Sequence, residues 1–148
     1  MLEPKQKENQ AMKILLVVIS FLLVIQKTEA KVPKNLKECL VEMDAFLSDE
    51  DQENFLKYDE ETLLKAYNMS LGNYIRNSWV YEDAPLYNYF KEMCVEDNYQ
   101  MSHIIMISYH RMKLHKLINL SDQVEELIGK KAFKKCKSSF DSGMDDED

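Results

Sequence analysis

Glycine and proline are scarce in this sequence, with three of each in 148 residues. Runs of alternating apolar and polar residues, which indicate half-buried strands, are nearly absent. Apolar residues instead recur at spacings of three and four along most of the chain, which is the pattern of amphipathic helices. The sequence therefore predicts an all-α fold, a compact bundle of about five short helices, and excludes a sheet-based architecture.

Recognisable catalytic motifs are also missing. The chain has no Gly-x-Ser-x-Gly elbow, no glycine-rich phosphate loop and no Cys-His nucleophile signature. His103 and His110 are seven residues apart and share a helix face, but zinc needs three or four closely spaced ligands, so both are expected at the surface. We predict a protein that is not an enzyme and has no metal and no cofactor. The alternative is a small hydrolytic enzyme that uses His103 or His110.

The first 30 residues have the layout of a secretory signal peptide. Lys13 precedes an apolar run, Ile14 to Ile25, in which Ser20 is the one polar residue, and a small residue, Ala30, ends the segment. The run is too short to span a bilayer, so we expect cleavage after Ala30 and a secreted or periplasmic protein without a stable membrane anchor. Translation could start at Met1 or at Met12, which would make the first residues an upstream extension.

Residues 31–148 keep 15 of the 19 lysines and arginines and 23 of the 26 acids, a formal charge of −8. A negative field of this kind disfavours nucleic acid as a partner. The chain has three cysteines, Cys39, Cys94 and Cys136, so one is left over if two of them pair. Export would permit a disulfide, but the spacing does not say which pair forms, and three thiols acting as small apolar groups remain an alternative.

The apolar periodicity predicts that residues 31–137 form a single helical domain. The first helix is expected to open at Pro33, Ser48 to cap the next segment, and Asp59 to cap a long helix that ends near Trp79. Asp83 and Ser121 are the expected caps of two later helices, with a further helix from Met101 to Met112 between them. Residues 138–148 hold five acids and little to bury, which predicts a disordered acidic tail.

The segment LGNYIRNSW, residues 71–79, suggests where a site could lie. Arg76 and Trp79 are neighbours on a helix surface, and Asn77 flanks them. A guanidinium can fork onto a carboxylate and lie across an aromatic ring. One interpretation is a structural clamp in which Arg76 pairs with an acid on another helix, the candidates being Glu82, Asp83 and Asp97. The other is a pocket in which Arg76 and Asn77 bind an anionic or amide-bearing ligand beside Trp79.

Three blocks of the sequence, LGNYIRNSW, LYNYF and MSHIIMISYHR, resemble a small bacterial family known as a domain of unknown function. The resemblance extends over about Pro33 to Ile128. It implies signature positions at Leu71, Gly72, Ile75, Arg76, Asn77, Trp79, Met101, Ser102, Ile105, Ser108 and Arg111. Histidines that belong to the family pattern have no counterparts here, and the three cysteines lie outside that pattern. Arg111 and Ser102 could join Arg76 around one anion, or could simply pack together.

These observations favour an exported, non-catalytic binding or interaction module. Its site would be built from Arg76, Asn77, Trp79, Ser102 and Arg111, and its partner would be an unknown protein or a small anionic ligand. A third possibility, beside the small enzyme, is a protein that neutralises a toxin or inhibits an enzyme, for which a small acidic helical domain is suited.

Overall fold

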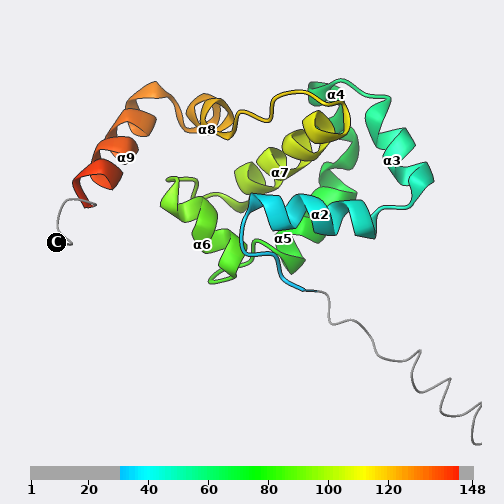
Figure 1. The fold of residues 1–148 in the computed structure, drawn as a ribbon, viewed down its shortest axis with the longest axis horizontal. Coiled ribbons are helices and arrows are strands. Elements are labelled where there is room, and N and C mark those ends of the chain that lie inside the picture. The colour runs from blue at the N-terminus through cyan, green and yellow to red at the C-terminus, as the bar shows by residue number, and fades with distance from the viewer. Residues whose placement is uncertain (1–30, 144–148) are drawn as a thin grey trace, which may run out of the picture. The chain divides into compact units, whose positions relative to one another are not determined.

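The computed structural model describes residues 31–143, with side chains up to residue 136. No strand occurs in this part of the chain, so the all-α prediction is confirmed, although there are more helices than the five or so expected. They are α2 (Leu36–Phe46), α3 (Asp49–Leu56), α4 (Glu60–Tyr67), the π-helical turn η1 (Asn68–Gly72), α5 (Asn73–Ser78), α6 (Pro85–Glu92), α7 (Asn98–Lys113), α8 (Leu120–Ile128) and α9 (Lys130–Gly143) (Figure 1).

The predicted signal peptide, residues 1–30, lies outside the described residues. The predicted acidic tail is described only as far as Gly143, and this portion continues α9. Among residues 31–143, no helix combines the length and apolar character that crossing a membrane requires.

Two of the predicted helix caps are confirmed. The Ser48 side chain accepts a hydrogen bond from the backbone N–H of Asp51, and the Asp59 side chain accepts one from Thr62. Each bond satisfies one of the amide groups that have no acceptor within the first turn of a helix. These caps set where α3 and α4 begin.

Three other predicted helix starts are wrong. The first helix begins at Leu36 rather than at Pro33, because the Asn35 side chain accepts from the Glu38 amide. Asp83 lies one residue before the N-cap of α6, which is Ala84, and Asp83 has a left-handed backbone. The last pair of helices begins with α8 at Leu120, so Ser121 is already inside the helix. Asn35 and Ala84 have the extended backbone usual for a cap, whereas Asn119, before α8, has a left-handed backbone.

The central helix of the domain is α7, which packs against α2, α3, α4, α5, α6 and α8. It also begins earlier than expected, because the Asp97 side chain caps it at Asn98. Its buried residues, such as Ile104, Ile105 and Tyr109, lie in one apolar cluster with Leu40, Met43, Phe55, Leu63, Ile75, Leu86 and Phe90. Burying this surface drives the helices together and holds α5 against the first turns of α7.

The expected long helix from Asp59 to Trp79 is interrupted at η1. A π-helical turn has a wider spiral than an α-helix and often marks a functional position. Gly72 ends this turn and is buried. A Cβ added to Gly72 would lie 3.0 Å from Nη1 of Arg76 and 3.4 Å from the methyl group of Met106 on α7. The chain is therefore tightly packed at Gly72, against the Arg76 side chain and against a second helix.

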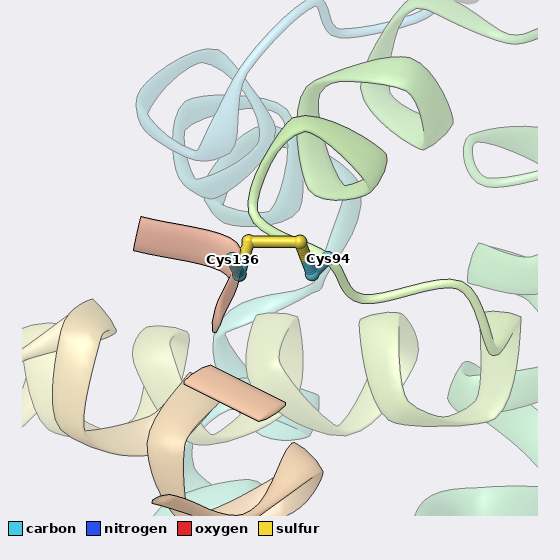
Figure 2. Close-up of a disulfide and its surroundings, with 2 residues drawn as sticks. All are labelled: Cys94 and Cys136. Carbon is cyan, nitrogen blue, oxygen red and sulfur yellow. A yellow bond between two sulfur atoms is a disulfide. The ribbon is translucent and has the colours of Figure 1, made fainter. Parts of the chain in front are cut away.

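The pairing of the cysteines is resolved by the structure. Cys94, in the loop after α6, forms a disulfide with Cys136 of α9 (Figure 2), and Cys39 is a buried free thiol. Burial and the nearby Glu42 raise the pKa of Cys39, so this thiol stays protonated and unreactive in the folded protein. The disulfide attaches α9 to the loop that leads into α7.

Candidate functional site

Arg76 projects from α5 into a buried position between η1 and α7, with 6% of its surface exposed. Its Nη1 donates to Oδ1 of Asn68 at 3.1 Å and to Oγ of Ser102 at 3.0 Å. Its Nη2 donates to the backbone carbonyl of Asn68 at 2.9 Å. The guanidinium therefore ties η1 to α7 through neutral acceptors.

Two further residues of α7 complete these surroundings. The Tyr99 ring lies against the guanidinium, with 4.0 Å between the ring centroid and Cζ of Arg76. The positive charge is attracted by the negative face of the ring. Burial lowers the pKa of the half-buried His103, and the nearby charge of Arg76 lowers it further, while Asp97 opposes the shift. We call Asn68, Arg76, Tyr99, Ser102 and His103 the Arg76 site.

The backbone arranges this site in a simple way. The π-helical turn presents both the carbonyl and the side chain of Asn68 toward a guanidinium that is eight residues further along the chain. Gly72 leaves the space that the guanidinium occupies. The Ser102 hydroxyl donates to the carbonyl of Tyr99 at 2.8 Å, which leaves its oxygen free to accept from Arg76. Each contact thus depends on a particular local conformation.

The acidic partner predicted for Arg76 is not found. Within residues 31–136, no carboxylate lies at ion-pair distance from Arg76, and this includes the expected candidates Glu82, Asp83 and Asp97. A clamp between two elements does exist, but its acceptors are an amide, a hydroxyl and a carbonyl oxygen. The site therefore holds a positive charge that no nearby side chain neutralises.

Asn77 and Trp79 do not contribute to the Arg76 site. The Asn77 side chain is exposed and donates to Asn73, one helical turn earlier. Trp79 is 3% exposed and packs edge-on against Tyr74, with 5.4 Å between ring centroids. The ring that covers Arg76 is Tyr99, so the predicted pairing of the guanidinium with the indole is wrong.

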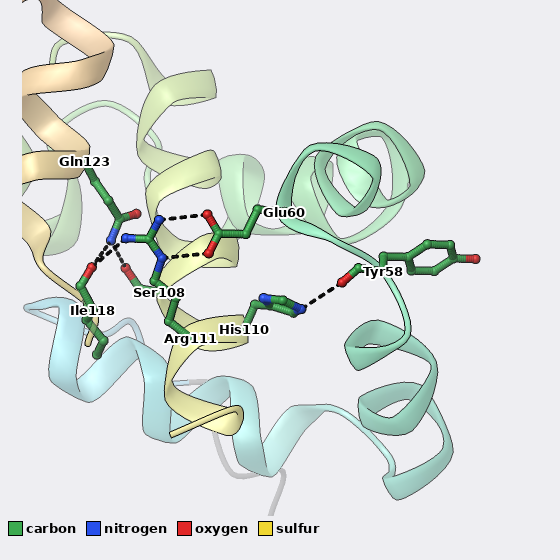
Figure 3. Close-up of polar contacts among 7 residues, drawn as sticks. All are labelled: Tyr58, Glu60, Ser108, His110, Arg111, Ile118 and Gln123. Atoms are coloured by element: carbon green, nitrogen blue, oxygen red, sulfur yellow. Dashed lines mark hydrogen bonds and ion pairs between the residues drawn. The ribbon is translucent and has the colours of Figure 1, made fainter. Parts of the chain in front are cut away.

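Arg111 forms a separate structural contact. Its Nε and Nη2 each donate to one oxygen of Glu60 at 2.7 Å, and its Nη1 donates to the carbonyl of Ile118 at 3.0 Å (Figure 3). Ser102 and Arg111 are nine residues apart on α7, which places them about 13 Å apart along the axis and on opposite faces. The two arginines therefore do not converge on one anion.

The Glu60–Arg111 pair makes stability depend on pH on the acidic side. The hydrogen bonds from Arg111 hold the pKa of Glu60 below its ordinary value of 4.5. A carboxyl whose pKa is lowered on folding stabilises the protein above that ordinary value, and this contribution is lost as pH falls through the lowered pKa. We expect Glu60→Gln to cost about 1–3 kcal/mol at neutral pH and to make the acid-side loss of stability shallower.

Urea denaturation at several values between about pH 7 and pH 3 measures this effect. Glu61→Gln is the matched control, because Glu61 is 80% exposed and pairs only with Lys65 at the surface. An acid-side slope in Glu60→Gln equal to that of the wild-type protein would contradict the assignment.

The histidines do not form a catalytic arrangement. His110 is 2% exposed, so its predicted surface position is wrong, and its ring nitrogen Nε2 lies 3.0 Å from the carbonyl oxygen of Tyr58 (Figure 3). A substrate cannot reach a side chain that is buried in this way. His103 is half-buried in the Arg76 site, where the neighbouring Ser102 hydroxyl donates to the carbonyl of Tyr99 and accepts from Arg76. In the described part of the chain, no three metal-binding side chains are grouped where they could hold an ion.

Sequence reasoning missed Asn68, Tyr99 and Glu60. Two of them carry a weak signal in hindsight. Tyr99 is three residues before Ser102 and so shares its helix face, and Asn68 is four residues before Gly72 on the same side of a helical segment. Glu60 is 51 residues from Arg111, and no spacing rule connects them.

Two open grooves with volumes of about 400 and 490 Å³ lie along α8 and α9. Their walls carry mostly charged side chains, namely Asp122, Glu125, Glu126, Lys130, Lys131 and Lys135. The three acids line one groove and the lysines line the other, and most of these side chains are exposed, so neither groove is built around a buried charge. The grooves are therefore weaker candidates than the Arg76 site.

Comparison with known protein families gives one match. Residues 32–113 fit the model of a domain of unknown function, DUF6794. The chain belongs to this family. The DUF6794 domain begins just before α2 and ends with the last residue of α7, short of the expected limit at Ile128. It contains the whole Arg76 site and the Glu60–Arg111 pair, whereas α8, α9 and Cys136 lie beyond it. The function of this family is unknown, and no match was found among curated proteins or solved structures.

Proposed function

We propose that the protein is exported and acts as a non-catalytic binding module, with the Arg76 site as its binding locus. The observation that carries this proposal is the charge of Arg76, which is nearly buried but has only neutral acceptors in the described residues. A buried charge is costly unless an opposite charge compensates it. A partner that supplied a negative group would remove this cost on binding.

The surface beside Arg76 suits a protein partner. Tyr99 is 50% exposed and Met69, which follows Asn68, is 79% exposed. Exposed aromatic side chains and methionines are enriched in protein interfaces, where they surround charged anchors such as arginine. The site therefore offers both an apolar surface and a positive charge.

Export is supported by two independent features. The segment of residues 13–30 has the order of a signal peptide. The Cys94–Cys136 disulfide is a bond typical of oxidising compartments outside the cytosol. Both are expected of a protein that meets its partner in the envelope or outside the cell.

Capture from an envelope extract of the source organism, followed by mass spectrometry, tests the binding role. Tyr99→Ala keeps the guanidinium and its three hydrogen bonds, so it should leave the fold intact while lowering partner recovery at least about tenfold. Arg76→Lys keeps the positive charge but loses the planar pair of donors of the guanidinium. It should also lower partner recovery at least about tenfold.

Tyr81→Ala is the matched control, because Tyr81 is 46% exposed and lies outside the Arg76 site. Asn77→Ala serves as a second control on the same helix as Arg76. Helical content and melting temperature are measured for all four variants. Equal recovery of the same proteins by wild type, Tyr99→Ala and Arg76→Lys would overturn the proposed function, as would equal losses in the two controls.

A further inference from the structure

The chain contains two arginines, Arg76 and Arg111, and within the described residues only Arg111 donates a hydrogen bond from Nε. Arg111 donates from Nε and Nη2 to the two oxygens of the Glu60 carboxylate. Arg76 uses Nη1 twice and Nη2 once, always to neutral acceptors. The protein thus holds one guanidinium whose Nε–Nη2 edge carries a carboxylate and one whose corresponding edge has none.

A count of donors shows what is left on Arg76. A guanidinium has five N–H groups. Three of them bond to Asn68 and Ser102, so the Nε–H and one N–H of Nη2 have no acceptor within residues 31–136. Such a pair of parallel donors matches the two oxygens of a carboxylate.

The Nε atom of Arg76 is not fully buried. In the described residues, the fully buried side-chain nitrogens and oxygens without a partner are Nδ1 of His110 and Oε1 of Gln123. Nε of Arg76 has no partner and is not one of them, so it retains contact with solvent. Since Asn68 and Ser102 accept from other N–H groups, a carboxylate on the unused donors would displace neither of them.

We propose that the Nε–Nη2 edge of Arg76 binds a single carboxylate of a peptide or protein partner, in the way that Arg111 binds Glu60. This inference rests on the proposed function and names the chemical group that the binding module recognises. The carboxylate would be a chain terminus or an acidic side chain, with its neighbouring apolar atoms against the exposed face of Tyr99.

The charges around the site favour a carboxylate over a phosphate group. Arg76 brings one positive charge, and the nearby His103 is shifted toward its neutral form. Asp97 lies close enough to His103 to raise its pKa against the other two effects, and its negative charge repels a dianion more strongly than a monoanion. A monoanion with two coplanar oxygens fits this balance, whereas a phosphate dianion would call for further cations.

Nuclear magnetic resonance of the arginine Nε–Hε groups tests the inference directly. The ¹⁵N-labelled protein should give two such signals, and Arg76→Lys assigns them by removing one. We expect N-acetylglycine, which imitates a C-terminal carboxylate, to shift the Arg76 signal downfield with saturation at millimolar concentrations, on the order of 1–10 mM for so small a ligand. The Arg111 signal is the internal control and should not move, because Glu60 already occupies that edge.

Two other ligands, added at constant ionic strength, separate the explanations. N-acetylglycinamide has the same shape without the charge and should leave both signals in place. Inorganic phosphate should shift Arg76 at least about tenfold more weakly than N-acetylglycine does. The inference is overturned if N-acetylglycine causes no saturating shift of Arg76, if the neutral amide causes the same shift, or if phosphate binds more tightly.

These outcomes are distinguishable from failure of the proposed function. If partner capture depends on Tyr99 and Arg76 but N-acetylglycine does not bind, the carboxylate inference fails and the binding module stands. If N-acetylglycine binds Arg76 as expected but capture is unaffected by both substitutions, the carboxylate inference holds and the proposed function falls.

Discussion

Replacing both Cys94 and Cys136 by alanine should lower the free energy of unfolding by about 4 kcal/mol. The reason is chain entropy, because the disulfide closes a loop across a sequence separation of 42 residues. Without the bond, the unfolded chain gains the conformations that this closure excluded. Urea denaturation monitored by circular dichroism, with and without the bond, measures the difference.

The reductant provides the control for this prediction. Dithiothreitol should destabilise the wild-type protein to the level of the double variant and have no effect on the variant itself. Cys39 does not interfere, because its thiol is fully buried and unpaired. If the oxidised and reduced wild-type proteins unfold at the same urea concentration, the bond contributes nothing to the folded domain and the prediction is wrong.

Phe55→Ala should destabilise the protein by about 3–5 kcal/mol, the usual cost of removing a fully buried phenyl ring. Phe55 is the one residue of α3, a helix described over its whole length, that is fully buried. Its ring meets those of Tyr67, Tyr109 and His110, with centroids 5.0, 5.6 and 6.1 Å away. The substitution therefore empties the site at which α3 attaches to α4 and α7.

Hydrogen exchange, measured together with urea denaturation, shows how this loss is distributed. We expect the amides of α3 to lose most of their protection, because no other fully buried side chain of that helix holds it in place. Glu53→Ala is the matched control on an exposed position of the same helix. A change below about 1 kcal/mol for Phe55→Ala would mean that the ring is not packed as described.

The sequence was sufficient to predict the helical architecture and the position of its most unusual charge. Spacings of three and four identify helices because burial of one face repeats with the helical turn. The caps at Ser48 and Asp59 could be predicted because each oxygen bonds an amide only three residues away. Arg76 could be identified as a candidate because the chain has two arginines and this one lies next to predicted core positions.

The partners of these arginines could not be predicted in the same way. Asn68 reaches Arg76 because a π-helical turn replaces a regular α-helical one. No residue type in the segment predicts a π-helical turn. Ser102 is 26 residues from Arg76 in the sequence, and Glu60 is 51 residues from Arg111. Contacts of this range depend on how whole helices pack, which local periodicity does not contain.

The carbonyl of Ile118 accepts hydrogen bonds from both Arg111 and Gln123. Arg111 lies inside the family segment, whereas Ile118 and Gln123 lie beyond it. The hydrogen bond from Arg111 to Ile118 therefore connects the C-terminal part of the chain to the family domain. Gln123 also covers the hydroxyl of Ser108, which is fully buried. A fragment cut at residue 113 would expose that hydroxyl and leave Arg111 one acceptor short. In this chain, the packed structure therefore continues past the end of the family segment.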